Sequence, residues 1–379
     1  MLAYLDHAAT SPMRPEAERA MLDAVHEHIG NPSGLHSVAR KAAMALDEAR
    51  EVMAASLGGS PSEIVFTSGG TESDNLAIFG AHSARPGTVL CSAIEHHAVL
   101  ASASSIGARV IPVGRDGVVD LFALERMIDA SVSIVSVMLV NNETGIIQPI
   151  DEIAEILRKR APSAVLHTDA VAAFPFLDVA KAARSADLVS ISAHKFGGPQ
   201  GVGALLVRQG TSIAPLFRGG GQERGLRSGT HNMAGILAMA AAASATVAQR
   251  EESVRTVGRL RDRLADELLS RVDGAVETGN RTNKVVSNCH LCFPGAESEA
   301  ILFLADRNGV CASAGSACSS GAMQSSHVLA AMGLEGEVAK GAVRFSLGWN
   351  TSEEEVELAI SVIPGVVEQA RSRSMQKAG

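Results

Sequence analysis

The chain has 379 residues, of which 46% are hydrophobic and 20% are charged, and these values are typical of an ordinary globular protein with about two domains. Its net charge of −8 argues against non-specific binding to nucleic acid or to a membrane surface. No apolar run approaches the roughly 18 residues of a membrane span, and the first residues lack the regions of an export signal. We therefore expect a cytoplasmic protein whose five cysteines are reduced thiols.

Expected strands and helices alternate through the first half of the chain. After a helix over about 37–58, we expect strands at 63–68, 88–92, 109–113, 134–140, 164–167 and 186–191, with helices between most of them. Later helices are expected from 231, over 298–307 and from 352, with strands at 285–293 and 342–347. The alternation predicts an α/β domain with a largely parallel sheet, whose ligand lies beyond the carboxyl ends of the strands.

A turn with two glycines, Ser68-Gly69-Gly70-Thr71, joins the strand at 63–68 to a helix. Glycines at this place leave backbone N–H groups bare at the positive end of the helix, which is a typical phosphate site. N-capping by Thr71 or Ser73 is the simpler interpretation of the same residues. The turn alone does not separate the two interpretations.

Lys195 directly follows the buried strand at 186–191, among small residues. A lysine in a desolvated pocket loses its proton easily and attacks a carbonyl, as pyridoxal phosphate (PLP) chemistry requires. Asp169 and Asn142 follow two other strands, so a parallel sheet would gather all three residues, together with Gly70 and Thr71, at one edge. Asp169 and Lys195 then fit the two ends of a PLP ring. A surface lysine and a helix-capping aspartate are the alternatives.

Three other stretches carry reactive or polar groups. The glycine-rich loop 218–230 is suited to presenting Arg and Thr to anions, although it also fits a flexible connection. Small residues around Cys318 indicate an accessible loop with a reactive thiol. Cys289 and Cys292 have CxxC spacing, but on a strand they face opposite sides, so we expect no metal site. His96 is a candidate to cover a cofactor ring, with helix capping as the alternative.

Over nearly its whole length, the sequence resembles the cysteine desulfurases of the iron–sulfur-cluster and nitrogen-fixation type, which are fold-type I PLP-dependent transferases. The matching motifs are Tyr4-Leu5-Asp6, Asn31-Pro32-Ser33 with Leu35-His36, Thr67 to Asn75, Glu95-His96, Val140 to Gly145, His167-Thr168-Asp169-Ala170, Ser192 to Lys195, Gly219 to Thr230, Gly315 to Gly321 and Arg344-Phe345-Ser346. The resemblance implies a large domain over 16–250 with a mostly parallel seven-stranded sheet. A smaller α+β domain would combine 1–15 with 251–379.

The resemblance also implies roles for the cofactor-binding residues. Lys195 would form the Schiff base with PLP and act as general acid and base, and Asp169 would pair with the pyridinium nitrogen. His96 would stack on the ring and take part in catalysis, and Asn142 would bind the ring hydroxyl and help to hold the substrate. The phosphate would be bound by Gly70, Thr71, Ser192 and His194, with Thr230 supplied by the partner in a homodimer.

The implied reaction converts L-cysteine to L-alanine. Arg344 would bind the substrate carboxylate, and Cys318 would take the sulfur as a persulfide and pass it to a protein acceptor, either a cluster scaffold or a tRNA-thiolation enzyme. The sequence departs from the family where Ala172 replaces a usual glutamine and where His290 replaces a common asparagine. Another fold-type I reaction, such as selenocysteine cleavage or transamination, and a non-catalytic docking protein are the alternatives.

Overall fold

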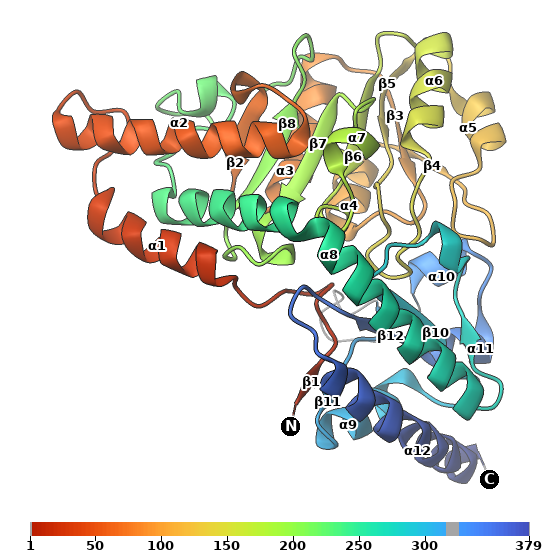
Figure 1. The fold of residues 1–379 in the computed structure, drawn as a ribbon. Coiled ribbons are helices and arrows are strands. Elements are labelled where there is room, and N and C mark those ends of the chain that lie inside the picture. The colour runs from red at the N-terminus through yellow and green to blue at the C-terminus, as the bar shows by residue number, and fades with distance from the viewer. Residues whose placement is uncertain (1, 316–325, 379) are drawn as a thin grey trace.

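The computed structural model describes residues 2–315 and 326–378, and a seven-stranded sheet forms the centre of its larger part (Figure 1). The strands lie in the order β2-β8-β7-β6-β5-β3-β4, and only β8 runs antiparallel to its neighbours. This arrangement confirms the predicted α/β class and the mostly parallel sheet. The strands are β2 (Ile64–Thr67), β3 (Thr88–Ser92), β4 (Arg109–Ile111), β5 (Val132–Ser136), β6 (Val165–Asp169), β7 (Leu188–Ser192) and β8 (Gly203–Val207).

Helices cover both faces of this sheet, because its central strands are buried on both sides. On one face Leu188 of the central strand β7 packs with Leu76 of the helix that follows β2, while its neighbour Val189 joins the larger core on the opposite face. Buried continuous strands of this kind are typical of parallel sheets. The helices of this part are α1 (Pro15–Glu27), α2 (Ser37–Leu57), α3 (Gly70–Ala84), α4 (His97–Ser105), α5 (Leu121–Met127), α6 (Ile150–Arg160) and α7 (Val179–Ala182).

The smaller part contains a three-stranded antiparallel sheet in the order β12-β10-β9 and a parallel pair, β1 with β11. Its strands are β1 (Ala3–Tyr4), β9 (Val276–Glu277), β10 (Asn288–Cys292), β11 (Val310–Cys311) and β12 (Ala342–Ser346). Its helices are α9 (Ser298–Arg307), α10 (His327–Ala331), α11 (Gly336–Lys340) and α12 (Glu353–Ala378). The N-terminal β1 thus pairs with a strand from the other end of the chain, which ties both ends into one unit.

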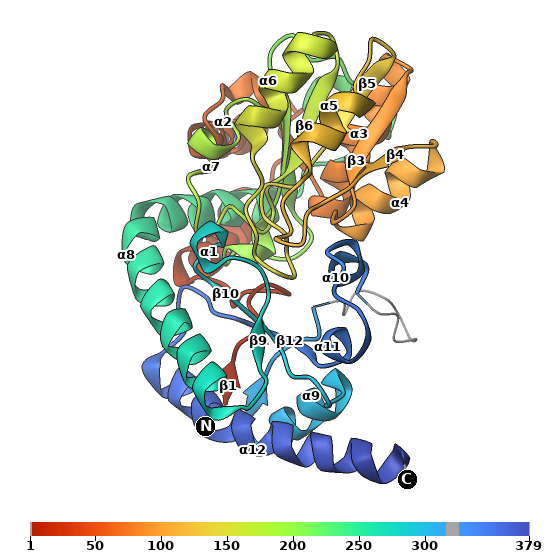
Figure 2. The ribbon, with the colours of Figure 1, turned by 90° about the vertical axis from the view of Figure 1, so that its right-hand side faces the viewer.

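One long helix, α8 (Met233–Arg271), runs from the seven-stranded sheet to the smaller part (Figure 2). It passes residue 250 without a break, so the domain division at that residue stays a prediction. Short 3₁₀ turns complete the described elements: η1 (Pro61–Glu63), η2 (Ala193–Lys195), η3 (Glu223–Gly225) and η4 (Arg281–Asn283). Within residues 2–315 and 326–378, no helix has the length and apolar character needed to cross a membrane.

Several expected elements are confirmed, and their boundaries show where sequence patterns are weakest. The strand 88–92 and the helix 298–307 match β3 and α9 at both ends. The strand expected over 134–140 is wrong at its end, because β5 stops at Ser136. Beyond β5, the Val137 and Leu139 N–H groups still donate to the His167 and Asp169 carbonyls of β6, and Val140 forms an isolated bridge with Ile147. The expected strand is therefore longer than β5, although part of its extra length still pairs with β6.

Candidate active site at the carboxyl edge of the sheet

A cavity of about 340 Å³ lies where the parallel strands end, between the seven-stranded sheet and the smaller part. Nine of the predicted site residues line it: Gly70, Thr71, His96, Asn142, Asp169, Ser192, His194, Lys195 and Arg344. Two predicted residues are not placed there. Thr230 is exposed and does not line the cavity, and Cys318 lies outside the described residues. Gly315, the last described residue before Cys318, does line it.

The glycine turn forms one wall of the cavity at the start of α3. Gly69 is the N-cap of this helix, with φ 152°, and it supplies no side chain for capping. Capping by Thr71 or Ser73 is therefore wrong, since the Ser73 hydroxyl instead donates to the Gly69 carbonyl at 3.1 Å. A Cβ on Gly70 would come within 3.0 Å of Val171 Cγ2, so the backbone is held close to the opposite wall. The first N–H groups of α3 thus face a cavity without a side-chain cap, which suits an anion.

Lys195 ends η2, the short turn that follows β7, and its ammonium group points into the cavity. Its Nζ donates to the carbonyl oxygens of Ala8 at 2.5 Å and Ala9 at 2.9 Å, both from the N-terminal segment that precedes α1. The segment 5–11 therefore reaches across from the smaller part and forms the far wall of the site. Neither carbonyl is charged, so the lysine is held in place without an ion pair to these two partners.

Two buried carboxyl groups lie at the floor of the cavity, below the lysine. Burial raises the pKa of Asp169 to about 6, while the Val171 N–H that its carboxylate accepts at 2.8 Å and the charge of Lys195 act to lower it. Burial also raises the pKa of Asp74, and the nearby Asp169 charge raises it further. Two buried carboxyl groups in a pocket of low dielectric would stabilise a cation placed between Asp169 and Lys195. Asp169 is therefore a buried carboxyl of the kind that can pair with a protonated ring nitrogen.

Two histidines line the cavity as neutral rings. Burial, with the nearby Lys195 charge, lowers the pKa of both His96 and His194 to about 4. His96 is the N-cap of α4, and its Nδ1 accepts the Ala98 N–H at 3.1 Å. The capping alternative for His96 is thus correct, and the same residue also faces the cavity. Because Nδ1 is an acceptor, the proton of the neutral ring lies on Nε2.

Arg344 is a buried cation that reaches the cavity from β12, with an exposed fraction of 3%. Its guanidinium donates to the Asn142 carbonyl at 2.9 Å and to Asp6 Oδ1 at 2.8 Å. Its Nε has no hydrogen-bond partner among the described residues. A buried guanidinium with unused donor capacity is suited to binding a carboxylate.

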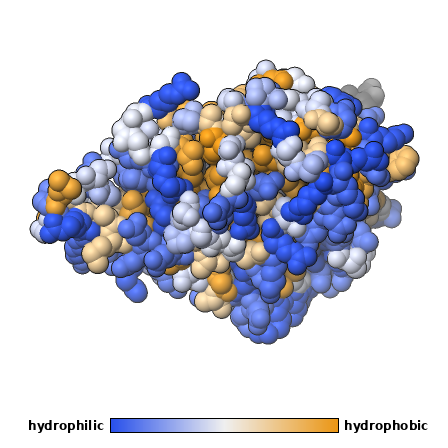
Figure 3. Space-filling view, turned by 90° about the horizontal axis from the view of Figure 1, so that it is seen from above, coloured by the Kyte–Doolittle hydropathy of each residue, from blue (hydrophilic) through white to orange (hydrophobic). Residues whose placement is uncertain are grey.

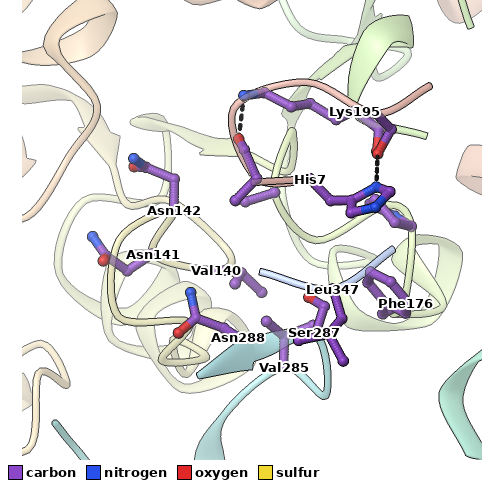
Figure 4. A pocket seen from close by; sticks show the side chains of 14 residues that line it. His7, Val140, Asn141, Asn142, Phe176, Lys195, Val285, Ser287, Asn288 and Leu347 are labelled. Carbon is purple, nitrogen blue, oxygen red and sulfur yellow. Dashed lines mark hydrogen bonds between the residues drawn. The ribbon is translucent and has the colours of Figure 1, made fainter. Parts of the chain in front are cut away.

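A second, smaller cavity of about 30 Å³ is also lined by Lys195 (Figure 4). Ala172 lines both cavities, as do Asn142 and Lys195. Asn288 also lines the smaller cavity, and its Oδ1 has no hydrogen-bond partner among the described residues. The volume is enough for one water molecule. The position where the family usually has glutamine is therefore bordered by this small cavity.

Sequence reasoning missed two acids that shape the site. Asp6 holds Arg344, and Asp74 lines the cavity from the first turns of α3. Asp6 lies within the motif Tyr4-Leu5-Asp6, which matches the family. Asp74 follows Gly70, the last glycine of the turn, by four residues, so both acids lie in or beside motifs that the sequence analysis describes. Their contacts depend on segments far apart in sequence, which no local pattern reveals.

The residues present fit PLP. A helix start whose N-cap is a glycine suits its phosphate, a buried carboxyl suits its ring nitrogen, and a lysine reaches the same space. A metal finds no such support, because the parts of the chain that the structure describes contain no cluster of three or more His, Cys, Asp or Glu able to hold one.

Comparisons with known proteins identify the family of the chain. Residues 3–358 match the family described as aminotransferase class-V. The chain is 42% identical to an IscS-like cysteine desulfurase from Mycobacterium tuberculosis, over 100% of this chain and 99% of that protein, and 40% identical to the cysteine desulfurase IscS of Dictyoglomus turgidum, over 99% and 96%. A solved NifS-like protein has a TM-score of 0.91 at 34% identity, covering 97% of this chain and all of that one. The chain belongs to the class-V aminotransferase family, with the fold-type I architecture of its NifS-like members.

Proposed function

We propose that the protein is a PLP-dependent cysteine desulfurase that converts L-cysteine to L-alanine and keeps the sulfur as a persulfide on Cys318. One observation carries the proposal: Lys195, Asp169, His96 and Arg344, from four separate parts of the chain, line a single cavity that also reaches Gly315. Curated cysteine desulfurases related to this chain along its whole length support the same reaction.

The substrate is held by its charged groups in this proposal. Its carboxylate binds the Arg344 guanidinium, which Asp6 and the Asn142 carbonyl keep in a fixed orientation. Because Arg344 is buried, the interaction forms in a medium of low dielectric and is stronger than at the surface. The amino group then lies toward Lys195, on the same side of the cavity as Asn142.

PLP, bound through Lys195, supplies an electron sink for charge that develops at the substrate Cα. The Asp169 carboxylate stabilises positive charge at the ring nitrogen, and the N-terminus of α3 with Ser192 and His194 binds the phosphate. Lys195 Nζ moves protons at the substrate once it is released from the Ala8 and Ala9 carbonyls. The neutral His96 ring carries its proton on Nε2, and from there it can exchange this proton with a thiol in the cavity.

We further propose a cytoplasmic homodimer in which Thr230 of one protomer completes the phosphate site of its partner. Its exposed position outside the cavity is compatible with a contact across an interface. Exposed apolar side chains at the α1–α2 end of the chain support a partner surface, and Figure 3 shows apolar atoms at that end, on the left. The sulfur acceptor would be a protein of cluster assembly or of tRNA thiolation.

Substitution of the nucleophile tests the reaction. Cys318→Ser should reduce alanine and sulfide formation from L-cysteine at least about 100-fold, while the absorbance change that L-cysteine causes in the bound cofactor remains. Lys195→Ala should abolish that absorbance change as well. Cys311→Ser, a change at another thiol that is not fully buried, serves as the matched control and should keep wild-type turnover.

The same experiment separates the alternatives. An aminotransferase would keep its activity in Cys318→Ser, and a selenocysteine lyase would prefer selenocysteine over cysteine in side-by-side turnover. A docking protein would show no cofactor absorbance that depends on Lys195. Full cysteine turnover in Cys318→Ser would contradict the proposed function.

A further inference from the structure

The backbone carbonyl oxygens of Ala8 and Ala9 converge on one point at the wall of the larger cavity. Both residues line that cavity, and both oxygens accept a hydrogen bond from Lys195 Nζ, at 2.5 and 2.9 Å. In Figure 4 a dashed line joins the end of the Lys195 side chain to this segment. Within residues 2–315 and 326–378, no other hydrogen bond reaches either oxygen. Two acceptors that meet at one point suit a primary ammonium group, which carries three N–H donors.

A turn over residues 6–9 keeps the two oxygens directed at the cavity. The Ala9 N–H donates to the Asp6 carbonyl at 3.0 Å and closes this turn. The Ala8 N–H donates to Ser346 Oγ at 2.8 Å, which fastens the turn to β12. Asp6 and Ser346 also form an isolated parallel bridge through their backbones. The turn is therefore held both from within and by the smaller sheet.

The same turn also fixes the residue that binds the substrate carboxylate in the proposed reaction. Asp6, two residues before Ala8, accepts from the Arg344 guanidinium at 2.8 Å. Arg344, Ala8 and Ala9 all line one cavity. An α-amino acid carries its carboxylate and its ammonium group on the same carbon atom. A segment of four residues thus positions partners for both charged groups of such a ligand.

Lys195 Nζ is the nitrogen through which PLP binds in the proposed function. Once it is joined to PLP, this nitrogen no longer carries the three donors of an ammonium group, and the Ala8 and Ala9 oxygens are then open to another donor. Ala8 is half-buried and Ala9 is exposed, so a solute that enters the cavity can reach them. Burial keeps His96 and His194, which line the same cavity, neutral, so neither ring repels a cation.

We propose that the Ala8 and Ala9 carbonyls are the binding site for the ammonium group of the substrate, which they accept in the place of Lys195 Nζ. The carboxylate of the same molecule binds Arg344, and Asp6 and Ala8 of one turn hold the two ends in register. This proposal rests on the proposed function, because it names the site that receives the amino end of L-cysteine. The site distinguishes a primary ammonium group from a quaternary one, since both acceptors require N–H donors.

The binding test uses the full-length Lys195→Ala protein, freed of PLP, with methylammonium chloride as the probe. Methylammonium should raise the melting temperature in a saturable way. Tetramethylammonium, which has the same charge and no N–H donor, should leave it unchanged. Lys181→Ala, also freed of PLP, is the matched control, because Lys181 is an exposed lysine of α7 that does not line the cavity. It should not respond to methylammonium, since Lys195 Nζ still occupies the two carbonyls.

Substitution of Ser346 tests whether the turn positions the site. Ser346→Ala removes the oxygen that accepts the Ala8 N–H. It should weaken methylammonium binding to the Lys195→Ala protein about fivefold, the effect of losing one hydrogen bond. In the PLP-loaded enzyme it should raise KM for L-cysteine by a similar factor and change kcat less. Ser346→Thr keeps the hydroxyl group and should recover both values to within about twofold.

Two inhibitors separate the ammonium site from the carboxylate site. L-Alanine carries both charged groups, whereas propionate carries the carboxylate alone. In PLP-loaded Ser346→Ala, inhibition by L-alanine should weaken about fivefold. Inhibition by propionate should stay as in the wild type, because propionate uses Arg344 and not the carbonyl pair.

Two results would overturn the proposal. One is an equal effect of methylammonium and tetramethylammonium on Lys195→Ala. The other is an equal loss of inhibition by L-alanine and propionate in Ser346→Ala, which would place the defect at Arg344. If Lys195→Ala does not fold, the Ser346 variants decide the question. Failure of the proposed function looks different, since the wild type would then form no alanine from L-cysteine while Lys195→Ala would still bind methylammonium.

Discussion

Arg344 combines burial with two acceptors that fix its guanidinium, one a carboxylate and one a backbone carbonyl. Such a group binds a substrate carboxylate through a planar pair of N–H donors, which a lysine cannot reproduce. A lysine at this position would keep the positive charge and would lose only the planar pair of donors to the carboxylate.

We expect Arg344→Lys to raise KM for L-cysteine by about tenfold and to change kcat less, because the lost contact serves binding before the reaction. Steady-state kinetics at constant pH measure both constants. Arg250→Lys, a change at a partly buried arginine of α8 that does not line the cavity, is the control and should leave KM unaltered. An unchanged KM in Arg344→Lys would remove this residue from the substrate site.

His290 and Ala172 are the two departures from the family pattern that the structure places close to the site. His290 lies behind Glu143, where its neutral ring is buried against the carboxyl. Ala172 borders the small cavity beside Lys195, where a longer side chain would occupy the space. Neither effect follows from the sequence alone, because each depends on which distant side chain lies opposite.

At the scale of elements, the loop over 218–231 is held in place by one buried carboxylate. Glu223 accepts two hydrogen bonds from Arg50, at 2.7 and 2.8 Å, and others from the Phe66 N–H and His231 Nε2. Glu223 and Arg224 have φ values of 48° and 58°, which non-glycine residues rarely adopt. The ion pair therefore holds a strained turn, and the loop that leads to Thr230 is fixed rather than a mere flexible connection.

We expect Glu223→Gln to lower the free energy of unfolding by about 3 kcal/mol, because it leaves the Arg50 charge buried without its partner. Burial alone would raise the pKa of Glu223, but hydrogen bonds from Arg50 and His231 lower it to about 2. Its stabilising contribution is therefore present above about pH 4.5 and is lost as the pH falls toward 2. Urea unfolding between pH 7 and pH 3 should show the stability difference between the two proteins become smaller toward pH 3. Equal stability at pH 7 would contradict the assignment.

At the scale of the whole molecule, the proposed homodimer explains why Thr230 lies outside the cavity of its own chain. Several large apolar side chains of the α1–α2 region are exposed, and a partner would cover them. They are Leu22, Val25, Ile29, Leu35 and Met44.

Mixed dimers provide the measurement. Thr230→Ala should weaken PLP binding by about tenfold, as expected for one hydrogen bond to a charged group, and Lys195→Ala should be inactive. A dimer with one chain of each kind should regain about half of wild-type turnover, because one of its two sites has an intact Lys195 and an intact Thr230 from the partner. Absence of this recovery, or a monomer in sedimentation, would rule out the shared site.

The sequence by itself determined the α/β class, the parallel sheet and the order in which the glycine turn, Asn142, Asp169 and Lys195 follow their strands. These features depend on two local patterns, namely the alternation of apolar strands with helices and the small residues at the strand ends. The topology of a parallel sheet then places the carboxyl ends of these strands together. Only the tertiary structure decided that Ala8 and Ala9 hold Lys195, that Asp6 holds Arg344, and that Glu143 packs against Gly315. Each of these contacts joins residues far apart in the chain. Packing and burial determine which residues meet, and neither produces a periodic pattern in the sequence.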